Sequence, residues 1–325
     1  MLNLFCQRNG ACLCAIAVAA LGWNVAPARA QNAEPIDIRV NLRQGERVTL
    51  QILNERSQAL PGQAPSKSKS AANASAQVQN ITQTDILVRW VRTGGRVLEP
   101  SPPELFAQRM LELEQASPLE VELSATGMVL DVRNWREVKQ AIDARLEDLL
   151  NELVRGGAKP EVAGTLVGRV RESIATQEGV EKLTADDAYI YFAMSGRTVR
   201  PGQTSEYAGE LASPFGGERV PAPIVLTVKN HDPAKGTITI RSEQKADMDE
   251  ARRMMVEFLK RSANDQGKPF DEAKLPKSIG IATVSEYLIE LESGLPLKLV
   301  HGREINVDGV VQIDSTAMQR VAKQL

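Results

Sequence analysis

A block of helical sequence, residues 134–196, lies between two long arms of short alternating segments, and this arrangement limits the folds open to the chain. Apolar residues recur at intervals of three and four within the block, which predicts an amphipathic helix over Trp135–Arg155. Similar spacing predicts two more helices, over Glu161–Gln177 and Ala185–Met194. Helices gathered in the middle of a chain, with strands before and after them, are typical of an α+β protein.

The first helix of the block has the clearest pattern. Its apolar stripe opposes a row of charged residues and consists of Val138, Ile142, Leu146, Leu149, Leu150 and Leu153. Burying these side chains contributes on the order of 10 kcal/mol before conformational entropy is subtracted. We therefore expect this helix to belong to the core of the protein.

The two arms alternate apolar and polar residues with the period of half-buried strands. The segments with this pattern are 36–42, 47–53, 78–91, 119–123, 128–132, 205–211, 223–230, 237–244, 281–291, 297–303 and 310–313. Further helices are predicted over 101–114 and 247–261, and short turns between strands predict antiparallel neighbours. Residues 58–77 contain few large apolar side chains and many Ala, Ser and Gln residues, a composition that predicts a mobile loop.

Residues 1–30 have the features of an export signal. Arg8 precedes the apolar run Ala11–Leu21, and Ala28-Arg29-Ala30 has the small-residue pattern of a cleavage site. The apolar run is shorter than the roughly 20 residues that cross a bilayer, and no later stretch approaches that length. We expect cleavage after Ala30, a mature chain without a membrane span, and a periplasmic or secreted location. Residues 31–325 then form a single α+β domain.

Loss of this signal also changes the chemistry of the chain. All three cysteines, Cys6, Cys12 and Cys14, lie within it, so the mature protein has no disulfide and no cysteine nucleophile or metal ligand. The formal net charge is −2 for the whole chain. It becomes about −4 once the two arginines of the signal are lost. A nearly neutral chain without a basic cluster argues against nucleic acid as a partner.

Residues suited to acid–base or metal chemistry are sparse. A histidine-based triad or metal site would need His231 or His301, the two histidines of the chain, to meet acids from elsewhere in the fold. Asp186 and Asp187 are adjacent, but neighbouring residues of a helix point about 100° apart, and acids are favoured at a helix start in any case. Ser242-x-x-Lys245 has the spacing of a serine–lysine acyl enzyme but lies at a strand end. We predict a non-enzymatic protein with no catalytic residue, no metal site and no cofactor.

Two hairpins of the sequence resemble those of known bacterial domains. Tyr287–Leu299 (YLIELESGLPLKL) resembles a strand–turn–strand of bacterial lipoprotein-carrier-like domains. Val121–Val129 (VELSATGMV) is similar to a hairpin of uncharacterised secreted bacterial domains. The resemblance implies a curved antiparallel sheet partly wrapped around helices, with an apolar concave face that holds acyl chains. It transfers no catalytic residue.

Aromatic and methionine side chains provide the candidate binding site, because they suit adaptable apolar pockets. The candidate ligand-binding residues are Tyr189, Tyr191, Phe192, Met194, Met254, Met255 and Phe258. The alternative is that they are ordinary core, since methionine commonly fills gaps in a core.

Together, these patterns and the resemblance predict an α+β fold in which a curved antiparallel β-sheet, an open half-barrel, packs on the central helical block 134–196. Two functions agree with this prediction. The first is an exported, periplasmic, non-enzymatic protein that binds an apolar ligand or lipid in a cavity between sheet and helices. The second is an envelope interaction or structural protein that has an envelope protein partner and no small ligand, because the helices fill the sheet.

Overall fold

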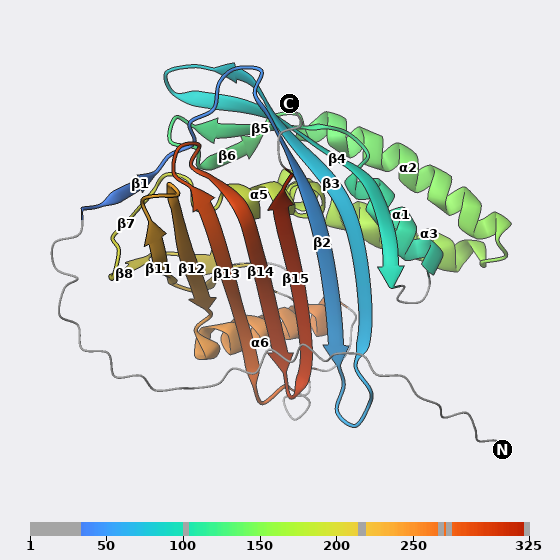
Figure 1. Ribbon diagram of the computed structural model, residues 1–325. Coiled ribbons are helices and arrows are strands. Elements are labelled where there is room, and N and C mark those ends of the chain that lie inside the picture. The colour runs from blue at the N-terminus through green and yellow to red at the C-terminus, as the bar shows by residue number, and fades with distance from the viewer. Residues whose placement is uncertain (1–33, 100–103, 214–218, 266–269, 271–274, 322–325) are drawn as a thin grey trace, which may run out of the picture. The chain divides into compact units, whose positions relative to one another are not determined.

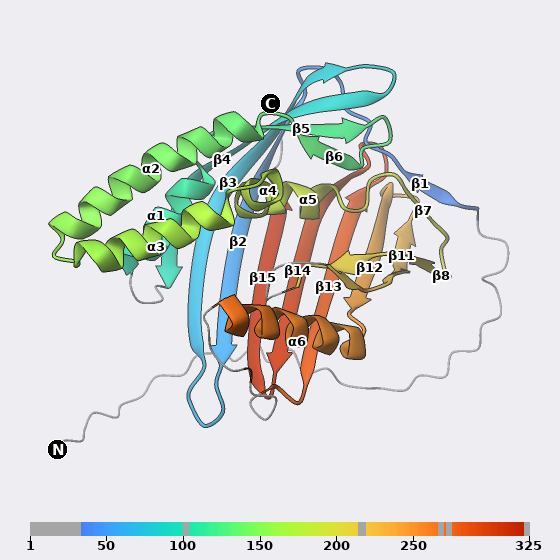
Figure 2. The ribbon, with the colours of Figure 1, turned by 180° about the vertical axis from the view of Figure 1, so that it is seen from behind.

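Antiparallel strands, several of them joined by short turns, build one large sheet of eleven strands. The computed structural model describes residues 34–99, 104–213, 219–265, 270 and 275–321. The sheet order is β6-β5-β4-β3-β2-β15-β14-β13-β12-β11-β8, so that β6 and β8 form its two edges. The sheet is curved, and helices lie across its concave face (Figures 1 and 2). The predicted fold class, α+β with a curved antiparallel sheet packed on helices, is confirmed.

The strands of the sheet are β2 (Arg47–Ala59), β3 (Ser66–Ile81), β4 (Asp85–Glu99), β5 (Leu119–Ser124), β6 (Val129–Val132), β8 (Thr204–Tyr207), β11 (Ile224–Asp232), β12 (Thr237–Lys245), β13 (Ile279–Glu290), β14 (Leu295–Val307) and β15 (Val310–Arg320). Two small pairs stand apart from it: β1 (Ile36–Ile38) with β7 (Arg197–Val199), and β9 (Glu210–Leu211) with β10 (Val220–Pro221). Because β15 pairs with β2, the last described strand joins the two arms of the sequence into one sheet.

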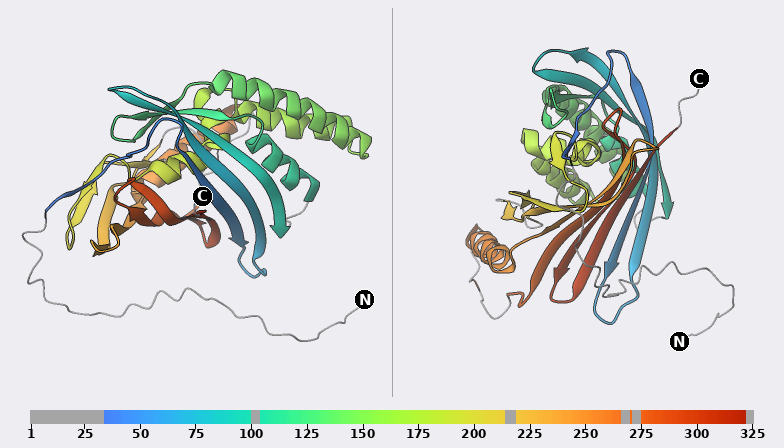
Figure 3. Two further views of the ribbon diagram at one scale, coloured as in Figure 1. Left: turned by 45° about the horizontal axis from the view of Figure 1, so that its top comes forward. Right: turned by 60° about the vertical axis from the view of Figure 1, so that its left-hand side comes forward.

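The helices are α1 (Glu104–Glu114), α2 (Trp135–Arg155), α3 (Pro160–Ser173), α4 (Gln177–Thr184), α5 (Asp186–Phe192) and α6 (Met248–Asp265). Helices α4 and α5 cross the concave face at one level and α6 crosses it at another (Figures 2 and 3). Helix α2 has the predicted bounds, whereas the block contains four helices instead of the predicted three. Thr176 caps the unpredicted α4 by accepting a hydrogen bond from the backbone N–H of Gly179 at 3.2 Å. A side chain at Gly179 would collide with the carbonyl of Ser173, so glycine permits this tight turn.

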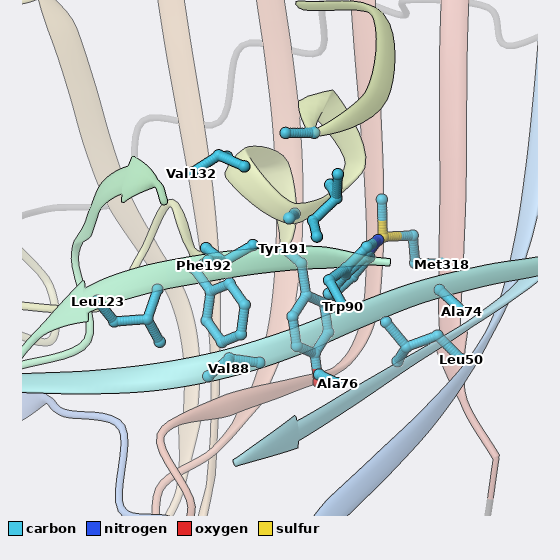
Figure 4. Packing of buried hydrophobic residues seen from close by; sticks show 14 of the residues in the cluster. Leu50, Ala74, Ala76, Val88, Trp90, Leu123, Val132, Tyr191, Phe192 and Met318 are labelled. Carbon is cyan, nitrogen blue, oxygen red and sulfur yellow. The ribbon is translucent and has the colours of Figure 1, made fainter. Parts of the chain in front are cut away.

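The prediction of a mobile loop over 58–77 is wrong, because β3 begins at Ser66 and pairs with β2 and β4 along its length. The residues Ala72, Ala74, Ala76 and Val78 alternate on its buried face. Large side chains from other elements cover this face, so small residues suffice here (Figure 4). A segment of small residues cannot form a core alone, but it can pack against large side chains from other elements and so become part of a core.

The main core lies between the helical block and one half of the concave face. The ring centroids of Trp90 and Tyr191 are 5.9 Å apart, and those of Tyr191 and Phe192 are 5.1 Å apart (Figure 4). The hydroxyl of Tyr191 donates to the carbonyl of Pro296, and that of Tyr287 donates to the carbonyl of Ile190. These two bonds connect α5 to β13 and β14. They also satisfy the hydroxyl groups of Tyr191 and Tyr287, so that both rings can be buried in the core.

A second, smaller core lies under α6. Ala251, Met254 and Met255 of this helix pack on Ile279 and Ile281 of β13. Asp247 caps the helix by accepting a hydrogen bond from the backbone N–H of Glu250. The concave face therefore carries two separate apolar regions, and the candidate functional site lies between them. The predicted export signal, residues 1–30, lies outside the described residues.

Candidate functional site

A polar belt crosses the concave face between the two cores. Cross-strand register aligns its inward side chains in two rows, which lie next to each other because residues two apart on a strand share a face. The first row is Ser70, Asn54, Thr316, His301, Ser285 and Ser242. The second row is Ser68, Arg56, Asp314, Arg303, Thr283 and Gln244. Every member is polar, although the neighbouring row on the aromatic side is apolar throughout: Ala72, Ile52, Met318, Leu299, Tyr287 and Ile240.

The part of this belt on β2, β3, β14 and β15 forms the floor of a cavity of about 1020 Å³. Helices α1, α4 and α5 supply the opposite wall, and Arg92, Val97 and Glu99 of β4 line one end of the cavity. Apolar side chains of that wall include Met110, Leu111, Leu183 and Ile190, whereas Arg92, Asp186 and other charged residues line the remainder. The cavity is therefore amphipathic, with a polar floor and a mixed wall.

A buried ion cluster joins the wall to the sheet. The side chain of Arg92 on β4 is 8% exposed, and its Nη1 lies 2.5 Å from Glu114 Oε2 of α1 and 3.2 Å from Asp187 Oδ2 of α5. One guanidinium thus serves two carboxylates. Burial raises the pKa of Glu114 to about 7, because the attraction of Arg92 offsets only part of the desolvation and Asp187 adds repulsion. Burial also raises the pKa of Asp187.

Replacing Glu114 by glutamine should change how stability depends on pH. The pKa of Glu114 in the folded protein, about 7, lies above its ordinary value of 4.5, so the folded state binds this proton more tightly and loses stability as pH rises through that window. The shift corresponds to about 3 kcal/mol. Burial lowers the pKa of His301 to about 4, which gives an opposite dependence between about pH 4 and 6.5.

The two groups nearly cancel in the unmodified protein, so the comparison of protein and variant is the informative measurement. Urea unfolding at several pH values should show the free energy of unfolding of Glu114→Gln gaining about 3 kcal/mol on the parent between about pH 4.5 and 8. A difference between the two proteins that stays constant with pH would contradict the raised pKa of Glu114.

His301 lies in the belt, and its Nδ1 is 2.8 Å from Ser285 Oγ. Its lowered pKa keeps the imidazole neutral at neutral pH. A catalytic triad would also need a carboxylate on the other ring nitrogen. Within the described ranges, His301 has no such contact, and His231 lies in β11 outside the cavity. Asp186 and Asp187 begin α5 as predicted, but Asp187 is engaged by Arg92.

The structure does not bring the seven predicted binding residues into one pocket. Tyr191, Phe192 and Met194 are buried in the main core, and Met254 and Met255 belong to the separate core under α6. Phe258 lies on the same helix as that second group. Of the seven, Tyr189 lines the cavity, and its hydroxyl donates to Glu181 at 2.8 Å. The seven residues therefore do not form the shared apolar site that was predicted. Tyr189 lies in the cavity beside the polar belt, and the others lie elsewhere.

The polar belt was not predicted, although the sequence of β14 contains a signal for it. Leu299, His301, Arg303 and Ile305 occupy one face of this strand, so two polar residues interrupt an otherwise apolar alternation. The predicted strand 297–303 ended within the interruption. The register with β15 and β2, which aligns similar interruptions, depends on pairing between distant segments.

Two further properties bear on the class of site. No helix in the described part of the chain is both long and apolar enough to cross a membrane. Among the residues that the structure describes, no group of three His, Cys, Asp or Glu side chains is arranged to hold a metal ion.

Comparison with known proteins identifies no family. No family model matches the chain, and no curated protein matches it in sequence. Among solved structures, lipovitellin, studied for its lipid–protein interactions, is similar at a TM-score of 0.44 and 8% identity over 88% of this chain and 27% of the lipovitellin chain. An outer membrane channel from Pseudomonas putida F1 has a TM-score of 0.17 and 8% identity over 91% of this chain and 100% of that one. The resemblance of Tyr287–Leu299 to lipoprotein-carrier-like domains, and of Val121–Val129 to uncharacterised secreted bacterial domains, stays a prediction.

Proposed function

We propose that this is an exported, non-enzymatic binding protein whose ligand is amphiphilic and lies between the concave face of the sheet and helices α1, α4 and α5. The observation that supports this most is the cavity of about 1020 Å³ with a polar floor and an apolar part to its wall. Ligand sites typically enclose roughly 300–1,000 Å³ and combine apolar walls with a few polar groups. A wholly apolar ligand would displace water from the belt and offer its polar groups no hydrogen bond, at a cost for each buried group left unpaired.

The length of the cavity favours an extended ligand. Its lining residues come from β4, β3, β2, β15 and β14, which are consecutive neighbours in the sheet. Strands lie about 4.8 Å apart, so four steps span roughly 19 Å. Val97, Met110 and Leu111 lie at the β4 end, and His301 and Arg303 lie at the β14 end. An amphiphile with its chain along Val97, Met110 and Leu111 and its polar group toward β14 fits this arrangement, because the charged Arg92 and Glu114 near the β4 end are paired with each other.

The proposed location outside the cytoplasm has a separate support. The sequence of residues 1–30 combines a basic residue, an apolar run and an A-x-A site, as export signals do. A carrier for amphiphiles is also useful where such molecules must cross an aqueous compartment. Amino-terminal sequencing of the protein from an extracellular or periplasmic fraction tests this part, and a chain that still begins at Met1 would contradict it.

Filling the cavity should abolish ligand binding. Ser70 faces the cavity, whereas its neighbour Ala71 belongs to the opposite face of β3. Ser70→Trp places an indole in the cavity, and Ala71→Trp places the same group outside it. Solvent extraction and mass spectrometry of the protein as purified should find a bound amphiphile in the parent and in Ala71→Trp, and little in Ser70→Trp.

The other candidate function is an envelope interaction protein without a small ligand. The ion pair Arg56–Asp314 favours it, because cavity residues that pair with one another can remain hydrated without a ligand. Absence of any co-purified amphiphile from all three proteins, together with failure of added fatty acids and lysolipids to bind, would select this alternative.

A further inference from the structure

One cation of the polar belt has no carboxylate partner. Arg303 Nη2 donates to the carbonyl of Ala212 at 2.7 Å, while its Nε is buried without a hydrogen-bond partner among the described residues. The other arginines that line the cavity are paired: Arg56 with Asp314, Arg92 with Glu114 and Asp187, and Arg219 with Glu178. Arg303 is therefore the arginine of this site whose charge no residue of the described chain neutralises at contact distance.

The surroundings of Arg303 explain why this charge is costly. Two of its neighbours in the belt are neutral, Thr283 on β13 and His301 on its own strand. Its neighbour on β15, Asp314, is already engaged by Arg56. Burial lowers the pKa of Arg303, which means that the protein solvates this cation less well than water does. An incompletely solvated cation in a cavity gains most from an anion that enters with the ligand.

A second cation lies near the same place. Lys182 of α4 lines the cavity and has no carboxylate contact in the described part of the structure. Arg303, Lys182 and Arg92 attract the carboxylate of Asp186 and Asp314 repels it, so these charged groups surround Asp186. Asp186 has no hydrogen bond or ion pair within the described ranges, and burial raises its pKa. Asp314 is paired with Arg56, and Arg92 with Glu114 and Asp187, so Arg303 and Lys182 face the single carboxylate of Asp186 and leave a local excess of positive charge at the β14 end of the cavity.

We infer that the polar end of the ligand is an oxyanion, a carboxylate or a phosphate, held by Arg303 with Lys182 as a second cation. This inference rests on the proposed function, because it gives the chemical class of the group at the polar end of the same ligand. Arginine presents its donors in a planar fork that matches both kinds of oxyanion. The chain of the ligand extends from there toward Val97, Met110 and Leu111.

Binding assays with chain-matched amphiphiles test the inference. A long-chain fatty acid and a lysophosphatidic acid should bind about tenfold more tightly than the fatty alcohol of the same chain, since hydrogen bonds to charged groups are the strong ones. Arg303→Gln should remove this preference and leave binding of the alcohol unchanged, while Arg303→Lys should keep part of it. The matched control is Arg241→Gln, because Arg241 lies outside the cavity and is paired with Glu243.

Asp186→Asn provides an independent variant, since Arg303 also makes a structural bond to Ala212. Removing this acid should strengthen binding of the fatty acid several-fold, because a repelling charge near the oxyanion is lost. Equal affinities for the acid and the alcohol, unchanged by Arg303→Gln and Asp186→Asn, would overturn the oxyanion site and leave the amphiphile proposal standing.

Binding of free acetate and inorganic phosphate tests the oxyanion site separately from the proposal that the ligand is an amphiphile. Both should bind far more weakly than the amphiphiles, because they bury no chain. If phosphate binds as tightly as the lysolipid and loses affinity in Arg303→Gln, the oxyanion site stands and the amphiphile proposal fails. If nothing in the series binds, both fail.

Discussion

Replacing Leu146 by aspartate is expected to prevent folding. Leu146 is 0% exposed at the centre of α2, in one stripe with Val138, Ile142 and Leu149. An unpaired charge at this position loses its hydration and gains no partner, which costs several kcal/mol beyond the lost apolar contacts. Domains of ordinary stability have about 5–15 kcal/mol in total, so a loss of this size removes most of it.

Circular dichroism and urea unfolding measure this effect directly. Leu146→Asp should yield little soluble protein and no cooperative transition, whereas Leu146→Ala should fold with a loss of about 2–5 kcal/mol. Ala144→Asp is the matched control, because Ala144 is exposed on the same helix. Its free energy of unfolding should change by no more than about 0.5 kcal/mol. A cooperative melt of Leu146→Asp near that of the parent would show that α2 is not the anchor of the helical block.

The importance of α2 extends to the cavity. Helix α2 contacts α1, α3 and α4, and α1 and α4 carry residues of the cavity wall. Helix α2 does not itself line the cavity, so it acts as the support behind the wall. Partial loosening of α2 is therefore expected to change the width of the cavity before it changes the sheet.

Local periodicity predicted those parts of the fold that depend on neighbours along the chain. The stripe of α2 predicted its bounds, and short turns predicted the antiparallel strands around Ser293-Gly294 and Asp308-Gly309. Gly294 has a φ of 68° and lies against the backbone of Arg39, so this turn requires a residue without a side chain. Such signals are contained within a few residues, and the sequence expresses them directly.

Features that depend on distant pairing were predicted poorly. Nothing in the sequence around Ser66–Ile81 indicates that β2 and β4 will hold it on both sides, or that Trp90 will cover its alanines. For the same reason, the polar belt was not predicted: His301 and Thr316 become neighbours of Asn54 only through the pairing of β15 with β2. The aromatic residues looked like a site because large apolar side chains stand out in a sequence, but in the structure Tyr191 and Phe192 belong to the core and Tyr189 lines the cavity.

Replacing Arg92 by methionine is expected to produce the other large loss of stability. Arg92 is the shared cation of Glu114 and Asp187, and its removal leaves two carboxylates buried without a counter-charge. Removing one partner of a buried ion cluster typically costs about 3–5 kcal/mol. Arg109→Met is the control, because Arg109 bridges Glu112 and Glu152 with its side chain 34% exposed. Such partly exposed pairs contribute about 1 kcal/mol or less.

The pH dependence of this loss identifies its cause. If the cost arises from ionised carboxylates, the difference in free energy of unfolding between parent and Arg92→Met should shrink below the raised pKa of Glu114, about 7, where that group carries a proton even beside arginine. A purely steric cost would be the same at every pH. The triple variant Arg92→Met, Glu114→Gln, Asp187→Asn should recover most of the lost stability, because these three positions then carry no buried charge. Failure of the triple variant to recover would mean that Arg92 acts through packing between β4, α1 and α5, and the electrostatic account of this cluster would have to be abandoned.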